Sequence, residues 1–166
     1  MSSERDDVLA TLEQHRAFLR HTVQGLTDEQ ARLQPTASEL CLGGIIKHVS
    51  SVEGGWVSFI VDGPDAIGGF DDAAQEAHTA GFQMLADESL ASLLDRYEEV
   101  ATRTTAVVSG LHSLDDSQPL PSAPWFPPGA HWTARRVLLH VLAETSQHAG
   151  HADIIRESID GAKTMG

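Results

Sequence analysis

Residues 140–151 read H-V-L-A-E-T-S-Q-H-A-G-H, so three histidines and one glutamate fall within twelve residues of a largely apolar segment. On an α-helix, where each residue is turned by about 100° from the last, His140, Glu144, His148 and His151 lie within about a quarter-turn of arc. Apolar residues share this face, which a folded domain would bury. We therefore expect an amphipathic helix whose buried face carries several ionisable side chains.

The rest of the sequence contains three more segments of helical character. Apolar residues recur there at intervals of three and four, with charged residues between them. The four expected helices span residues 4–24, 38–61, 88–111 and 134–159. Asp87 and Thr133 are suitable N-caps for the last two helices, and Gly161 is placed to end the last one. Because no alternation typical of a strand appears, we predict an all-α four-helix bundle that occupies residues 1–166 as a single domain.

Two long connectors separate these helices. Residues 62–86 begin with turn-forming residues and lack sustained periodicity, which indicates a long crossover between the second and third helices. Residues 113–132 contain five prolines and are expected to form a stiff loop before the fourth helix. This loop carries Trp125, Phe126 and Trp132, which would form either a hydrophobic plug or a wall of a binding site. We take these three residues as candidates for binding a cofactor or substrate.

The second expected helix contains two pairs of adjacent glycines, Gly43-Gly44 and Gly54-Gly55. Each glycine inside a helix costs about 1 kcal/mol relative to alanine. Packing must offset this cost, and a neighbouring helix that approaches the glycines closely would do so. We therefore expect close packing along this helix.

The composition limits the function classes that fit the chain. It has 11 Lys and Arg against 24 Asp and Glu, a formal net charge of −13, which repels nucleic-acid phosphates and anionic membrane surfaces. No apolar run approaches the roughly 18–20 residues that span a bilayer, so we expect neither nucleic acid nor a membrane as a partner. The single cysteine, Cys41, cannot form an internal disulfide, and residues 1–7 lack the apolar segment of a signal peptide. A cytoplasmic location is expected.

The ionisable groups of residues 140–151 need partners if their helix face is buried. Burying them alone would cost several kcal/mol, and a divalent metal ion would compensate directly. Glu144 and His148, at positions i and i+4, can place a carboxylate oxygen and an imidazole nitrogen about 2 Å from one ion. A third ligand must come from another helix, and His48 lies on an apolar stripe there. Three protein ligands leave coordination positions for water or substrate, as in catalytic zinc sites.

Other interpretations of these residues are open. A Glu and a His at i and i+4 often form only a surface pair, so Glu144 and His148 by themselves are a weak signal. His151 is a candidate for supporting a ligand or for catalytic proton transfer, and His140 for a position at the rim of the site. The ligand set suits Zn²⁺ first, with Ni²⁺ or Fe²⁺ as alternatives, because the order of affinities alone does not decide the metal.

Three segments make the chain resemble the DinB-like superfamily. They are L-C-L-G-G-I-I-K-H-V-S-S-V-E-G-G-W (40–56), S-L-A-S-L-L-D-R-Y-E-E-V (89–100) and L-L-H-V-L-A-E-T-S-Q-H-A-G-H-A-D-I-I-R-E-S-I-D-G (138–161). Within that superfamily, the chain is most similar to small proteins related to the metal-binding domain of mycothiol-dependent maleylpyruvate isomerase. The resemblance implies a four-helix bundle whose divalent metal is held by His48, Glu144 and His148.

The resemblance also implies a function. Characterised relatives include thiol-dependent isomerases and thiol S-transferases, which implies chemistry between a low-molecular-weight thiol of the mycothiol type and a small electrophile. We therefore expect a metal-dependent thiol S-transferase, with a metal-dependent hydrolase or a non-catalytic metal-binding stress protein as alternatives. Because related proteins often pair through their bundles, a homodimer is also consistent with the resemblance.

Overall fold

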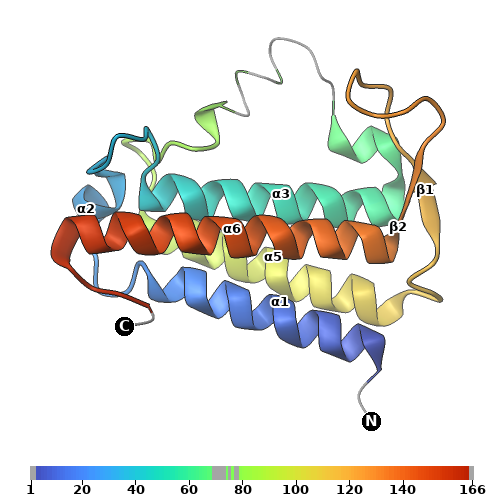
Figure 1. Ribbon diagram of the computed structural model, residues 1–166, viewed down its shortest axis with the longest axis horizontal. Coiled ribbons are helices and arrows are strands. Elements are labelled where there is room, and N and C mark those ends of the chain that lie inside the picture. Colours follow the sequence, from blue (N-terminus) through green and yellow to red (C-terminus); the bar gives the residue numbers. More distant parts are fainter. Residues whose placement is uncertain (1–2, 69–73, 75, 77–78, 165–166) are drawn as a thin grey trace.

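The computed structural model describes residues 3–68, 74, 76 and 79–164. Its elements are α1 (Glu4–His21), α2 (Asp28–Arg32), α3 (Leu42–Asp62), the 3₁₀ helix η1 (Pro64–Ile67), α5 (Leu90–Gly110), β1 (Ser117–Pro119), β2 (His131–Thr133) and α6 (Ala134–Asp160). The helices α1, α3, α5 and α6 form a bundle in which α6 packs against α1 and α3, and α5 packs against the same two helices (Figure 1). The predicted all-α four-helix bundle is confirmed. Among the described residues, no helix is long and apolar enough to cross a membrane.

The ends of α6 agree with the sequence. Thr133 accepts a hydrogen bond from the backbone N–H of Arg136 at 3.1 Å, which satisfies one donor of the first helical turn. Gly161 ends the helix in the left-handed conformation with φ 79°, which glycine adopts without a steric penalty. The helix that carries the clustered histidines is therefore bounded as predicted.

The expected N-termini of α3 and α5 were wrong by a few residues. The second helix begins at Leu42 and not near residue 38, because Cys41 is the N-cap and its Sγ accepts from the N–H of Gly44. The third begins at Leu90 with Ser89 as its N-cap, and not after Asp87. The hydroxyl of Ser89 accepts a hydrogen bond from the backbone N–H of Ser92, and the two serines form a capping box. Asp87 lies two residues too early in the chain to make this bond.

Two short strands were not expected. β1 and β2 pair antiparallel, with Ser117 opposite Thr133 and Pro119 opposite His131. Each strand is three residues long, which is too short for an alternating pattern to be recognised in the sequence. The pairing closes the base of the proline-rich loop and fixes that loop at the N-terminus of α6, as Figure 1 shows.

The predicted crossover between the second and third helices lies partly outside the described residues, which omit 69–73, 75 and 77–78. At its start, η1 follows directly after α3. At its end, residues 82–88 return along the N-terminal half of α3, and Met84 is buried in the core beside α3 and α5. This returning segment, residues 82–88, is called the return segment below.

The core also contains a buried ion pair. Arg16 of α1 and Glu53 of α3 are almost fully buried, and the guanidinium donates two hydrogen bonds to the carboxylate, one of them from Nε at 3.1 Å. Thr104 of α5 donates a further hydrogen bond to the same carboxylate at 2.5 Å. Three helices of the bundle are thus joined at one carboxylate, and the buried charge is compensated by a cation and a hydroxyl.

Candidate metal centre

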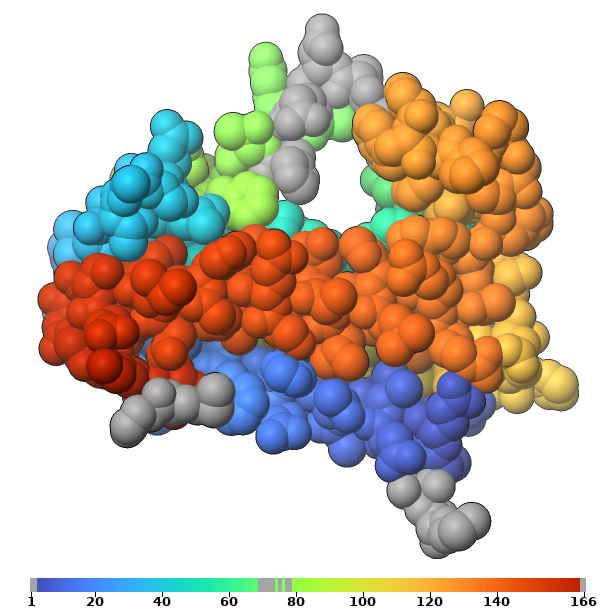
Figure 2. Space-filling view, viewed as in Figure 1, coloured from blue at the N-terminus to red at the C-terminus, as the bar shows by residue number. Residues whose placement is uncertain are grey.

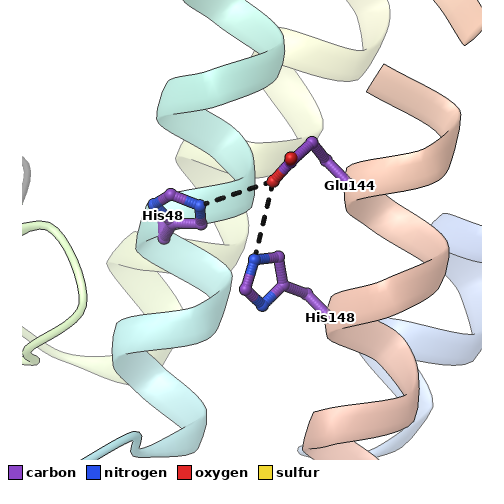
Figure 3. Close-up of side chains that lie close together, drawn as sticks. All are labelled: His48, Glu144 and His148. Carbon is purple, nitrogen blue, oxygen red and sulfur yellow. Dashed lines mark ion pairs between the residues drawn. The ribbon is translucent and has the colours of Figure 1, made fainter. Parts of the chain in front are cut away.

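His48 lies in the first half of α3, on the side that faces α6 (Figure 3). Ile45 and Val49 on the same helix are fully buried, and their packing carries the imidazole into the protein, where it is only 4% exposed. A neutral or charged imidazole at such depth needs a polar partner. The partner is a carboxylate of the facing helix.

Glu144 and His148 provide the other half of the cluster from α6. They lie one helical turn apart, and both side chains point toward α3 (Figure 3). The Oε2 atom of Glu144 is 3.8 Å from Nε2 of His48 and 3.6 Å from Nε2 of His148. The structure therefore brings together all three residues that the sequence marked as metal ligands.

The geometry and chemistry of this cluster fit a divalent transition-metal ion. One donor atom from each residue lies within 4.8 Å of the other two. Two ligands that each lie about 2 Å from one ion cannot be more than about 4 Å apart, so small side-chain adjustments would close the set around a metal. The nearby imidazole of His148, and then that of His48, hold the pKa of Glu144 well below its usual range despite partial burial. The carboxylate is therefore ionised at neutral pH, as a metal ligand must be.

His151 lies beside His148 on the side away from the carboxylate. The Nδ1 atoms of the two rings are 3.5 Å apart, whereas it is Nε2 of His148 that faces Glu144. If Nδ1 of His148 carries the proton and Nδ1 of His151 accepts the hydrogen bond, Nε2 of His148 is unprotonated and can bind an ion. His151 is thus placed to orient a ligand.

Phe82, a residue that the sequence did not mark, covers His48. The two rings are stacked, with centroids 3.8 Å apart and an interplanar angle of 21°. The same phenyl ring is 5.7 Å from the ring of His148. The glycine pair Gly43-Gly44 was the signal for a close neighbour here, but that neighbour is the return segment and not another helix.

An aromatic cluster lies on the side of Glu144 opposite to His148, toward the start of α6. His140, one turn before Glu144, packs against Trp56 and Trp132 at ring-centroid distances of 5.1 and 5.4 Å. The two indoles are stacked on each other at 4.7 Å, which joins β2 to α3. Burial lowers the pKa of His140 below its usual value, so its imidazole is neutral at physiological pH.

The loop residues Trp125 and Phe126 extend this cluster outward. The ring centroid of Phe126 is 5.9 Å from that of Trp132, and the ring centroid of Trp125 is 6.2 Å from that of Phe126. Trp125 is 62% exposed. Figure 2 shows an opening above α6 that is bordered on one side by the loop between β1 and β2. These aromatic side chains therefore extend from the half-buried Trp132 to the exposed Trp125.

A comparison with protein families identifies the chain. The model of the family described as Mycothiol-S-transferase matches residues 7–161, which include every residue of the cluster. The chain belongs to the mycothiol S-transferase family. This family is DinB-like, so the superfamily resemblance of the sequence is confirmed. Among curated proteins, none matches the chain.

A solved structure supports the fold of this mycothiol S-transferase family member. The chain is similar to a conserved protein from Enterococcus faecalis, with a TM-score of 0.71 and 15% sequence identity. The similarity covers 98% of this chain and 100% of the other. At this identity the comparison shows a shared fold and nothing about the reaction.

Proposed function

We propose that this protein is a metal-dependent thiol S-transferase that joins a low-molecular-weight thiol of the mycothiol type to a small electrophile. The observation that carries the proposal is the convergence of His48, Glu144 and His148 between α3 and α6, inside a chain of the mycothiol S-transferase family. Zinc is the first choice of metal, because two imidazoles and one carboxylate form a common catalytic zinc set. Nickel and ferrous iron also suit these ligands.

A divalent ion at this cluster would lower the pKa of a thiol and so supply a thiolate at neutral pH. The thiolate sulfur would then attack the electrophilic carbon, and a sulfur–carbon bond would form as the leaving group departs with its electron pair. The thiol proton passes to solvent or to a nearby base. For this last role His151 is the candidate from the sequence, and in the structure it would act beside His148.

The side chains around the cluster would separate the reactants from bulk water. Phe82 covers His48 on one side, and the aromatic cluster of Trp56, Trp132 and His140 lies on the other. Trp125 and Phe126 would contact the thiol or the electrophile as it enters from solvent. Excluding water strengthens the electrostatic stabilisation of a thiolate and prevents hydrolysis of a reactive electrophile.

The proposal is tested by measuring how fast the thiol adduct of an electrophile forms. Protein loaded with Zn²⁺ is incubated with mycothiol and monochlorobimane, and the fluorescent adduct is followed with time. Bacillithiol and glutathione are tested in parallel to define the thiol. We expect adduct formation well above the uncatalysed rate, and loss of this excess in His48→Ala.

His15 provides a matched control, because it is a histidine of α1 whose ring packs against Phe18 and not against the cluster. His15→Ala should keep the activity of the wild type. If wild-type protein and His48→Ala form the adduct at the same rate with every thiol, the proposal is wrong. Hydrolysis is the less suitable reaction for this site, because the one carboxylate of the cluster would serve as a ligand and not as a general base.

A further inference from the structure

The contact between Phe82 and His48 joins two parts of the chain that are distant in sequence. His48 is on α3, whereas Phe82 begins the return segment of the crossover. The rings lie nearly parallel with their centroids 3.8 Å apart, so the phenyl ring covers one face of the imidazole. Rotation of the imidazole about its χ2 angle would bring its edge against the phenyl ring.

The backbone at Phe82 can come this close only because α3 has glycine at the point of contact. A Cβ atom added to Gly44 would lie 1.8 Å from the carbonyl oxygen of Phe82, and one added to Gly43 would lie 2.3 Å from Sδ of Met84. At Gly44 the clash is with backbone atoms, so a side chain there would displace the return segment, whereas at Gly43 the clash is with the side chain of Met84. The pair therefore forms a seat for the return segment one turn before His48.

Polar contacts hold the rest of the return segment on α2 and α3. Lys47, next to His48 in the chain, forms an ion pair with Glu88 at 2.8 Å and donates a hydrogen bond to the carbonyl of Gln83 at 3.3 Å. Arg32 donates hydrogen bonds to backbone carbonyls of the same segment, including that of Leu85 at 3.2 Å. The phenyl ring is thus attached to the start of a segment that α2 and α3 hold at Gln83, Leu85 and Glu88.

We propose that Phe82 is a positioning residue of the metal centre. By covering one face of His48, it holds the imidazole in the orientation that directs Nε2 toward Glu144, and it shields this side of the centre from water. The inference rests on the proposed metal-binding function, because a fixed orientation of His48 matters to a bound ion. It also assigns a role to the glycine pair, which seats the segment that carries Phe82.

The first experiment follows Co²⁺ added to metal-free protein by its visible absorption, which reports the number and arrangement of ligands. We expect Phe82→Ala and Phe82→Leu to weaken Co²⁺ binding about tenfold and to change the absorption bands, the size of effect usual for residues that orient metal ligands. Phe82→Tyr should restore the spectrum of the wild type, because it keeps the flat ring. Leu85→Ala, a change at an exposed residue of the same segment, should leave affinity and spectrum unaltered.

The second experiment needs no metal and tests the contact between Phe82 and His48 by itself. In metal-free protein, the ring protons of His48 should show upfield NMR shifts caused by the phenyl ring, and these shifts should disappear in Phe82→Leu. Wild-type protein that binds no Co²⁺ would overturn the proposed function and, with it, the role of Phe82 at a metal. Folded Phe82→Leu, judged by circular dichroism, that keeps both the wild-type affinity and the wild-type bands would overturn the positioning role alone.

Discussion

Glu144 on α6 lies 3.8 Å from the imidazole of His48 on α3, and this contact joins the two helices at the candidate metal centre. The same carboxylate oxygen is 3.6 Å from His148, so both imidazoles face one ligand atom. We expect Glu144→Ala to reduce Zn²⁺ affinity by at least about a hundredfold, because it removes one of three protein ligands and leaves two imidazoles alone. Competition with a chromophoric chelator measures this change.

Glu157→Ala is the matched control for that variant. Glu157 is an exposed glutamate on the same helix and pairs with Lys163 near the end of the chain. Its removal should leave Zn²⁺ affinity within twofold of the wild type. Equal affinities in Glu144→Ala and Glu157→Ala would show that Glu144 is not a ligand.

Metal binding should also stabilise the bundle. His48 and the pair Glu144 and His148 come from different helices, so a bound ion would link α3 to α6 in the folded state only. At a free Zn²⁺ concentration a hundred times the dissociation constant, the free energy of unfolding should rise by about 2.7 kcal/mol. Thermal unfolding with and without a chelator measures this effect. His48→Ala should show no rise, and a rise equal to that of the wild type in this variant would place the metal elsewhere.

The sequence predicted the cluster of His48, Glu144 and His148 because the relevant signals are local. Glu144 and His148 are one helical turn apart, and His48 occupies an apolar stripe of its own helix, so each helix reveals a polar side chain on a buried face. Packing in a four-helix bundle then restricts which faces meet. The remaining step was to assume that the helix with His48 packs against the helix with Glu144 and His148. The family resemblance pointed to the same three residues.

The features that the sequence did not reveal depend on contacts between distant segments. Phe82 lies in a connector without periodicity, so no pattern indicated that its ring reaches His48. The pair Arg16 and Glu53 was equally hidden, because a charged residue in an amphipathic helix is normally assigned to the solvent face. The position of such a residue is decided by its partner on another helix, and the partner is known only from the fold.

Removing only one partner of the ion pair between Arg16 and Glu53 should strongly destabilise the bundle. Both side chains are nearly inaccessible to solvent, so Arg16→Met leaves a buried carboxylate without its cation. We expect a loss of about 3–5 kcal/mol in the free energy of unfolding, measured by urea denaturation. The double variant Arg16→Met, Glu53→Met should recover much of this loss, because neither charge then remains. If the double variant is as unstable as Arg16→Met, the cost comes from packing and not from the unpaired charge.

Trp125 should affect substrate binding without affecting folding. The residue is 62% exposed at the outer end of the aromatic cluster, so Trp125→Ala removes little buried surface and should change the free energy of unfolding by less than about 0.5 kcal/mol. In the adduct assay we expect the KM for the thiol or for the electrophile to rise by about threefold to tenfold, while kcat changes little. If Trp125→Ala has the KM of the wild type for both reactants, Trp125 is not part of the binding site.

The glycines of α3 should respond in opposite ways to the same substitution. At Gly44 an added Cβ would lie 1.8 Å from a backbone carbonyl oxygen, so Gly44→Ala must displace the return segment that carries Phe82. At Gly55, on the same helix, no atom of the described residues lies within 4 Å of an added Cβ, apart from the backbone of the helix itself and the two neighbouring residues. Gly55→Ala should therefore raise the free energy of unfolding by about 0.5–1 kcal/mol, the usual gain from replacing glycine inside a helix. We expect Gly44→Ala to lower the same free energy by more than about 1 kcal/mol, as measured by urea denaturation.

The effect at Gly44 should also reach the metal centre. Displacing the return segment moves Phe82 away from His48, so Gly44→Ala should lose the upfield shifts of the His48 ring protons and weaken Co²⁺ binding, as Phe82→Leu does. Gly55→Ala should keep both properties, because an added Cβ there meets no other segment among the described residues. If folded Gly44→Ala keeps the upfield shifts of the His48 ring protons, the phenyl ring stays in place although the return segment moves. The glycine pair would then not be needed to hold Phe82 against His48.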